Sequence, residues 1–176
     1  NLARAALFAA LVGAFAYVSF PFPVSPAPVT LQVLGVFLAG IFLGPVWGAT
    51  ALALYLGAGA LGAPVFSGGA AGFGVLVGST GGYLWSYPLA AGLVGAIAHR
   101  GGSLRDLDAV SAPVLVGAMV AGTVVVYAMG VAGLYLTLEL TPVESVVQGA
   151  VVFLPAEGAK MAAAVGIVRS DAIAAE

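Results

Sequence analysis

The feature that most constrains this chain is an uncharged apolar stretch covering residues 29–61. A membrane-spanning helix needs about 20 such residues, and inside lipid the backbone must form helices or a closed barrel because no water satisfies its polar groups. The apolar runs do not alternate with polar residues, which excludes the barrel. Only 7% of the 176 residues are charged, whereas a soluble domain carries about a quarter. The sequence therefore predicts an all-α integral membrane protein.

Prolines and glycines divide the apolar sequence into six predicted spans. The stretch 29–61 is too long for one crossing at about 1.5 Å per residue, and Gly44-Pro45 interrupts it. Pro155 divides the last apolar region, because proline is best tolerated in the first turn of a helix. We expect a short helix over residues 143–153 before that proline. The chain is then one membrane domain, residues 1–176, with spans at about 2–18, 30–43, 46–61, 81–98, 113–136 and 155–168 and a glycine-rich outer loop at 62–80.

The arginines indicate how these spans are oriented. Arg4 precedes the first span, and Arg169 follows the sixth. Arg100 and Arg105 lie between the fourth and the fifth. With six spans, all four arginines lie on one side of the membrane, which the positive-inside rule makes cytoplasmic. We therefore expect both termini in the cytoplasm.

Small residues recur every four positions along the first apolar run. They form two rows, Ala5, Ala9 and Gly13 on one side and Ala6, Ala10 and Ala14 on the other. Such a row suits docking onto another membrane helix, and equally suits packing within the same bundle. A secretory signal is an alternative interpretation, since Arg4 and a short apolar core precede the cleavage-like motif Ala14-Phe15-Ala16.

The composition excludes several classes of function. Five basic and seven acidic residues leave a net charge of −2, without the basic stripe that nucleic-acid binding requires. Cysteine is absent, which removes disulfides and thiolate metal sites. The segments around Gly72 and Gly82 lack the third fingerprint glycine and the phosphate-loop lysine, so no ATP-binding motif is present. His99 lies at a membrane boundary, where an interfacial role is favoured over a metal site. We expect no cofactor and no metal.

Two charged residues fall inside the last predicted span. Glu157 lies near its start, and Lys160, the only lysine, lies deeper. An ionisable side chain at depth costs roughly 2.5–3.5 kcal/mol on insertion scales and usually faces a cavity or a partner. Residues three apart share a helix face. Two structural interpretations are open: the two side chains form an ion pair that holds the bundle together, or Lys160 reaches toward the inner surface. The functional interpretation is that they bind a small polar solute through charge-assisted hydrogen bonds.

The glycine-rich loop is either a flexible linker or a lid whose backbone approaches a ligand. Tyr83 and Trp85 follow this loop on the predicted outer side. Tyr83 is equally consistent with a place in the aromatic belt at the membrane–water interface and with a ligand site, whereas for Trp85 we expect the belt. The belt is also the expected place of Trp47, Tyr17 and Tyr87.

Five short stretches, spread in order from the second predicted span to the sixth, carry a family resemblance. They are residues 28–32 (PVTLQ), 62–69 (GAPVFSGG), 78–83 (GSTGGY), 127–130 (YAMG) and 153–160 (FLPAEGAK). Together they resemble the BioY family, the biotin-binding membrane subunits (S-components) of energy-coupling factor (ECF) vitamin transporters. Relatives usually have glycine and aspartate in place of Ala156 and Glu157, and some have arginine in place of Leu84.

The resemblance implies a six-helix subunit of a prokaryotic plasma membrane that captures biotin in an outward-facing pocket. Loops after the first and third spans would cover this pocket. Small residues of the first helix, among them Ala5, Ala9, Gly13, Ala6 and Ala10, would dock onto a transmembrane coupling subunit that binds two ATPase subunits.

The same resemblance assigns expected contacts to biotin. Glu157 would accept hydrogen bonds from the ureido nitrogens, and Lys160 would donate to the ureido oxygen or pair with the carboxylate. Further contacts are expected from Phe66, Tyr83, Tyr127, Gln32, Gly69 and Ala70. The alternatives are another vitamin such as thiamine or riboflavin, a membrane enzyme that uses Glu157 and Lys160 as an acid–base pair, and a homo-oligomeric channel.

Overall fold

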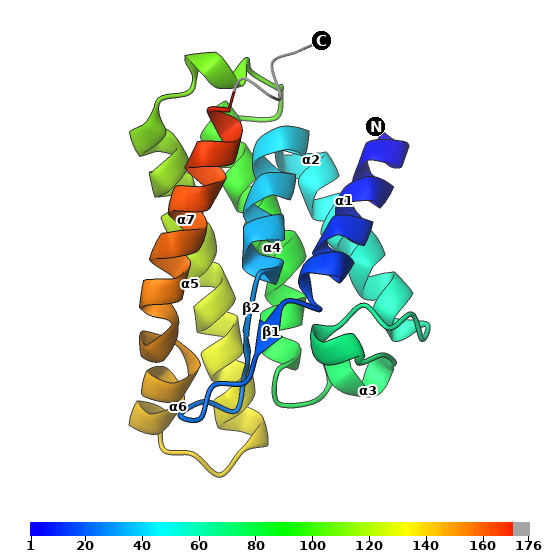
Figure 1. The fold of residues 1–176 in the computed structure, drawn as a ribbon, viewed down its shortest axis with the longest axis vertical. Helices are drawn as coiled ribbons and strands as arrows, with labels where there is room; N and C mark the ends of the chain where they lie inside the picture. The colour runs from blue at the N-terminus through cyan, green and yellow to red at the C-terminus, as the bar shows by residue number, and fades with distance from the viewer. Residues whose placement is uncertain (171–176) are drawn as a thin grey trace.

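The computed structural model describes residues 1–170, and long helices dominate it (Figure 1). The long helices are α1 (Leu2–Phe15), α2 (Gln32–Ala60), α4 (Gly81–His99), α5 (Ala112–Thr137) and α7 (Leu154–Val168). The short elements are β1 (Ser19–Phe20), β2 (Val29–Thr30), η1 (Ser67–Gly69), α3 (Phe73–Leu76), η2 (Leu107–Ala109), α6 (Pro142–Gly149) and η3 (Val151–Phe153). The helices run roughly along the long axis of the molecule and form one bundle.

Three helical segments of the described chain are long and apolar enough to cross a membrane. They are Gln32–Ala60, Ala112–Thr137 and Pro142–Val168. Helices α1 and α4 also form where the sequence predicts spans, but α1 is a shorter apolar helix. A mostly helical membrane protein is therefore confirmed, while the six-span count and the orientation stay predictions.

Helix α2 turns back on itself at Gly44, as the Gly44-Pro45 pair predicts. Gly44 has a φ of +75°, which glycine adopts without the clash that a Cβ causes. A Cβ placed on Gly48 would lie 3.0 Å from the Ala39 carbonyl oxygen. In a straight helix, residues 39 and 48 would be about 13.5 Å apart along the axis. The two arms, residues 32–43 and 45–60, therefore pack against each other (Figure 1).

The turn in α2 leaves a carbonyl that its own helix does not satisfy. Pro45 has no N–H for the Ile41 carbonyl four residues earlier. His99 Nε2 lies 2.8 Å from this carbonyl oxygen, and its Nδ1 accepts a hydrogen bond of 3.0 Å from the Arg105 N–H. Because Nδ1 accepts, the neutral ring carries its hydrogen on Nε2 and donates it to Ile41. His99 is thus a buried tie between the end of α4 and the turn of α2.

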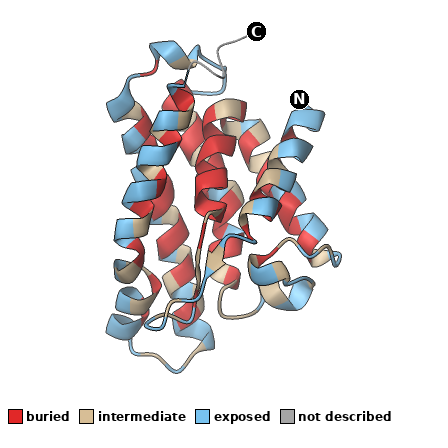
Figure 2. Ribbon diagram, in the orientation of Figure 1, coloured by how far each residue is buried: buried red, intermediate tan, exposed pale blue. Residues whose placement is uncertain are grey.

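Small residues bring the central helices into backbone contact. The first arm of α2 is buried along nearly its whole length and forms the centre of the bundle (Figure 2). A Cβ on Gly40 would lie 2.5 Å from the Ala91 carbonyl oxygen of α4. One on Gly82 of α4 would collide with the Met129 carbonyl of α5. These contacts are typical of membrane helices, whose association depends on close packing rather than on exclusion of water.

Helix α1 presents its two rows of small residues to different surroundings. Ala5 and Gly13 are buried, and Gly13 lies against Val65 of the loop after α2. Arg4 at the start of the helix donates a hydrogen bond of 3.4 Å to the Phe42 carbonyl near the turn of α2. The row that faces the bundle is therefore occupied by the chain itself. The other row is exposed; its members are Ala6, Ala10 and Ala14.

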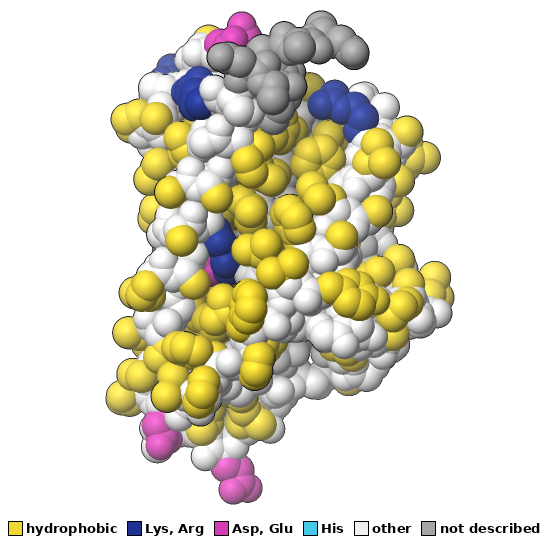
Figure 3. Space-filling view, viewed as in Figure 1, with side chains coloured by type: hydrophobic (Ala, Val, Ile, Leu, Met, Phe, Trp, Pro, Cys, Tyr) yellow, Lys and Arg dark blue, Asp and Glu magenta, His cyan; other side chains and the backbone are white. Residues whose placement is uncertain are grey.

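Most charged side chains lie at the two ends of the molecule, and the face between them is largely apolar apart from one basic and one acidic side chain at mid-height (Figure 3). One end holds the turn of α2 and the loop between α4 and α5, where Arg169 donates hydrogen bonds to the carbonyls of Leu107 and Val110. Glu139 and Glu144 belong to the opposite end, between α5 and α6. This separation agrees with the positive-inside interpretation of the sequence.

Candidate ligand-binding site

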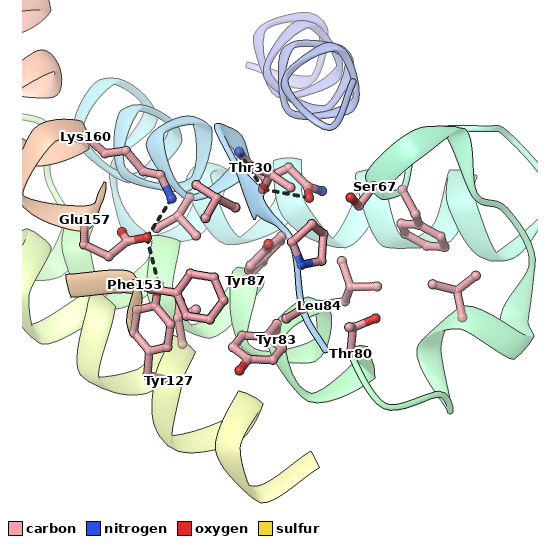
Figure 4. Close-up of a pocket in the computed structure, with 18 of the residues that line it drawn as sticks. Thr30, Ser67, Thr80, Tyr83, Leu84, Tyr87, Tyr127, Phe153, Glu157 and Lys160 are labelled. Atoms are coloured by element: carbon pink, nitrogen blue, oxygen red, sulfur yellow. Dashed lines mark hydrogen bonds and ion pairs between the residues drawn. The ribbon is translucent and has the colours of Figure 1, made fainter. Parts of the chain in front are cut away.

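A cavity of about 230 Å³ lies between the helix bundle and the loops that follow α1 and α2 (Figure 4). Its walls come from the segment that ends in β2, the start of α2, the glycine-rich loop, α4, α5, η3 and α7. The loops that cover it lie at the end away from the turn of α2. Ligand sites in helix bundles are typically of this kind, a mostly apolar pocket with a few convergent polar groups.

Glu157 is the most deeply buried charged residue of this cavity. Pro155 falls in the first turn of α7, so Glu157 follows within that turn and Lys160 lies three residues later on the same face. Glu157 Oε1 accepts hydrogen bonds from Lys160 Nζ at 2.6 Å and from the Tyr127 hydroxyl at 2.8 Å. Glu157 and Lys160 are 1% and 6% exposed. The ion pair that the sequence predicts as one alternative is therefore present.

The same pair also has unused hydrogen-bonding capacity. Glu157 Oε2 is buried and has no hydrogen-bond partner within residues 1–170. Lys160 has three donor hydrogens, and Glu157 is its only hydrogen-bond partner in that part of the chain. A buried polar atom without a partner is costly, so a ligand that offers both an N–H donor and an oxygen acceptor would be stabilised here. The pair is thus an ion pair that still has hydrogen-bonding capacity for a ligand.

Aromatic rings form one wall beside the pair. The rings of Tyr83 and Tyr127 meet edge to face with centroids 6.0 Å apart, and Tyr127 stacks on Phe153 at 5.9 Å. The Tyr83 hydroxyl donates a hydrogen bond of 2.6 Å to the Gly149 carbonyl at the end of α6. Tyr83 therefore offers its ring rather than its hydroxyl to the cavity, and it lies inside the bundle instead of an interfacial belt.

Gln32 and Phe66 are held in place by a second buried tyrosine, Tyr55. The Gln32 side-chain amide donates a hydrogen bond of 2.5 Å to the Tyr55 hydroxyl and accepts one of 3.1 Å from Thr30. The Phe66 ring meets Tyr55 edge to face at 5.6 Å and covers Gly59, where a Cβ would collide with the ring. These contacts leave Gln32 and Phe66 little freedom at the cavity wall.

The structure brings together most of the residues predicted to bind a ligand. The ones that line the cavity are Gln32, Phe66, Ala70, Tyr83, Tyr127, Glu157 and Lys160. Gly69 is not among the lining residues. It has a φ of +78° and lies against the ring of Tyr17, so its contribution is to the shape of the loop.

Tyr87 also lines the cavity, although the sequence predicts it in the interfacial belt. It is 4% exposed. Figure 4 shows its ring between the Glu157 end of the cavity and Leu84. Residues four apart share a helix face. The spacing from Tyr83 was the signal that could have placed Tyr87 here.

The two loops that cover the cavity are tied to each other. The Tyr17 hydroxyl donates a hydrogen bond of 2.6 Å to the Pro64 carbonyl. The hydroxyls of Ser19 and Ser67 lie 2.9 Å apart, and the Gly68 N–H donates to the Ala16 carbonyl at 3.3 Å. The glycine-rich loop therefore acts as part of the cavity cover rather than as a free linker.

Comparison with known proteins identifies the family of this chain. The BioY family model matches residues 1–175. The biotin transporter BioY of Thermotoga maritima is 40% identical over 131 residues, which are 74% of this chain and 72% of that protein. The biotin transporter BioY of Rhodobacter capsulatus is 39% identical over 140 residues, which are 77% of this chain and 70% of that protein.

A solved structure shares the fold. It is the crystal structure at 2.1 Å of the S-component for biotin from an ECF-type ABC transporter, and the match has a TM-score of 0.86 at 25% sequence identity. The match covers 96% of this chain and 88% of that chain. The family model matches residues 1–175, and the two relatives named above are 40% and 39% identical to this chain, so the chain belongs to the BioY family.

Proposed function

We propose that this chain is the subunit that captures biotin for an ECF uptake system, with the Glu157–Lys160 pair as the polar end of the binding cavity. The observation that carries the proposal is the unpartnered Glu157 Oε2 beside an ammonium group with spare donors. The chain belongs to a family of transport proteins. This argues against the alternative of a membrane enzyme that uses Glu157 and Lys160 as acid and base.

The chemistry of biotin suits this arrangement. Its ureido ring carries two N–H donors and one carbonyl acceptor, and the bicyclic body is apolar. An N–H group of the ligand would satisfy Glu157 Oε2, and the spare hydrogens of Lys160 would serve an acceptor oxygen. The rings of Tyr83, Tyr127 and Phe153 supply an apolar wall for the bicycle.

The proposal includes six membrane spans with both termini in the cytoplasm of a prokaryotic cell. The two arms of α2 would each cross the membrane, which brings the start of α1 and the end of α7 to the same side. The loops that cover the cavity lie at the end away from the arginines. By the positive-inside rule this end faces outward, where external biotin would enter.

Helix α1 supplies the proposed contact with a transmembrane coupling subunit, which in turn would bind two ATPase subunits. The row Ala6, Ala10 and Ala14 is exposed, whereas Ala5 and Gly13 pack against this chain. Of the five residues expected to dock, Ala6 and Ala10 are therefore the ones open to a partner, while Ala9 of the other row is half-buried. A smooth face of alanines permits close approach of a second helix.

The test is a biotin titration of the purified full chain in lipid nanodiscs. Lys160→Ala should abolish high-affinity binding, because it removes the ligand's donor and leaves Glu157 as an unpaired buried charge. Arg100→Ala, an exposed change at the far end, should bind as the wild type does. Circular dichroism and gel filtration of both variants would show that they are folded. Binding by Lys160→Ala with wild-type affinity would refute the assignment.

Another vitamin remains the nearest competing ligand. Thiamine carries a permanent positive charge and riboflavin a large flat ring system, and the cavity holds one acid already paired with a base. We expect that neither competes with labelled biotin. Mass spectrometry of small molecules that stay bound through purification would identify the natural ligand directly.

A further inference from the structure

We infer that this cavity does not recognise the negative charge of the ligand's carboxyl tail, so that biotin and its neutral carboxyl amide bind with similar affinity. The inference rests on the proposed function, because it takes the ligand to be biotin. It concerns which end of the ligand meets the Glu157–Lys160 pair.

The charges that line the cavity cancel one another. Within residues 1–170, Glu157 and Lys160 are its only acidic and basic lining residues, and they lie 2.6 Å apart. A carboxylate placed beside Lys160 would therefore also lie close to the Glu157 carboxylate. Attraction to the first charge is partly offset by repulsion from the second, since the two charges lie only 2.6 Å apart. The pair therefore offers a ligand anion less net attraction than an unpaired lysine would.

The hydrogen-bonding capacity of the pair also disfavours a carboxylate there. Glu157 Oε2 needs a donor, and an ionised carboxylate has none. A cyclic urea has N–H donors for Glu157 and a carbonyl oxygen for Lys160. It satisfies both partners and brings no charge into the buried end of the cavity. The uncharged ring of the ligand therefore belongs at this end.

The opposite end of the cavity is neutral and more open. Figure 4 shows Ser67 and Thr80 on that side, with Leu84 between them and the Glu157 end. Ser67 and Thr80 are partly exposed, and Ala70 beside them is exposed. A tail that runs along the Leu84 wall would end among hydroxyl groups and water. Hydroxyls donate to a carboxylate and to an amide oxygen alike, so the tail's charge is not selected there.

A thermodynamic cycle tests this inference. Biotin and biotin amide would each be titrated into the wild-type chain and into Lys160→Gln, both in nanodiscs. The wild type should bind the two ligands with Kd values within about threefold of each other. Lys160→Gln should weaken both ligands by the same factor, about tenfold or more, because it acts on the urea that they share.

A gain of selectivity provides the matched second test. Thr80→Lys would place a cation at the tail end and should favour the acid over the amide by about tenfold, because it introduces the charge partner that this end lacks. Thr80→Gln, of similar size but neutral, should keep the ratio near one. These variants lie at the half-exposed end, outside the buried pair.

Two results would overturn the inference. A wild-type preference for the acid above about thirtyfold, lost in Lys160→Gln, would show that the tail pairs with Lys160. If Thr80→Lys leaves the ratio of the Kd values of biotin and biotin amide unchanged, the tail does not lie at this end. If the wild type binds neither ligand, the proposed function itself fails, which is a different outcome from a change in the ratio.

Discussion

At the scale of single residues, the central feature is a carboxylate with one satisfied and one unsatisfied oxygen. Tyr127 and Lys160 both donate to Glu157 Oε1, while Oε2 has no partner in the described chain. Two donors on one oxygen fix the carboxylate and leave the other oxygen for a ligand. Tyr127 is therefore a positioning residue for Glu157 as well as a ring in the cavity wall.

Tyr127→Phe tests this positioning role. It keeps the ring against Phe153 but removes one donor from a buried carboxylate, which is worth roughly 1–3 kcal/mol. We expect biotin affinity to fall about tenfold or more, with the helical content unchanged. Tyr83→Phe is the control, because its hydroxyl binds the Gly149 carbonyl and not Glu157. It should lower the melting temperature more than the affinity. Wild-type affinity in Tyr127→Phe would contradict the role.

The residues of the site were predictable where an unusual chemical group stood out. Lys160 and Glu157 are conspicuous in an apolar helix, and the resemblance to a family marked Tyr83, Gln32 and Phe66. The sequence predicts Tyr87 in the interfacial belt instead, because an aromatic residue of an apolar helix gives the same local pattern whether it faces lipid, an interface or a cavity. Only the packing of α4 against its neighbours distinguishes these places.

At the scale of elements, the turn of α2 was predictable, because Gly44-Pro45 removes both a side chain and an N–H at one point. The short ribbon was not: Ser19 pairs with Thr30 and Phe20 with Val29 across a proline-rich connection. Strands of two residues are too short to show alternation. The prolines between β1 and β2 indicate a loop, and the pairing of the two strands depends on where α2 begins.

Gly44→Ala tests the turn. A Cβ there would sit at a φ of +75° and 2.8 Å from the Leu104 side chain. We expect destabilisation of roughly 1–3 kcal/mol, measured as a lower melting temperature in detergent. Gly57→Ala is the matched control on the second arm of α2, where a Cβ meets nothing within 4 Å. It should be neutral or raise stability by about 0.5–1 kcal/mol. Equal melting temperatures for the two variants would contradict this account of the turn.

The tie between the covering loops makes a kinetic prediction. Tyr17→Phe removes the hydrogen bond to the Pro64 carbonyl without changing the cavity lining. Biotin should dissociate about three to ten times faster, since the cover opens more often while the bound contacts stay intact. Tyr135→Phe, an exposed hydroxyl on α5, is the control and should leave the rate unchanged. Dissociation would be followed by displacing labelled biotin with an excess of unlabelled biotin, and an unchanged rate in Tyr17→Phe would argue against the tie.

At the scale of the whole molecule, the sequence predicted the order and bounds of the helices better than their contacts. Apolar length and helix breakers act locally, so the positions of α4 and α5 agree with the predicted ranges within about a residue or two. The cavity depends on contacts between distant segments, which no local pattern reports. Its polar end joins α5 to α7 through Tyr127 and Glu157, 30 positions apart in the sequence.

The whole molecule also shows why one polar pair is tolerated in this bundle. The face seen in Figure 3 is largely apolar around a basic and an acidic side chain at mid-height, so such a pair needs the cavity and the Tyr127 hydrogen bond to be stable there. A ligand that fills the cavity would complete the hydrogen bonds of the pair and stabilise the bundle. Binding energy and folding energy are linked in this way, and ligand should raise the melting temperature.

The contact between Glu157 and the ureido ring is the central claim, and a solid-state NMR distance measurement tests it most directly. The chain would be labelled with carboxyl-¹³C glutamate, reconstituted in lipid and bound to biotin labelled with ¹⁵N in the ureido ring. The account predicts one glutamate carboxyl carbon within about 4 Å of a ureido nitrogen, and loss of this contact in Glu157→Gln. Retained biotin binding with no such contact in the wild type would contradict it.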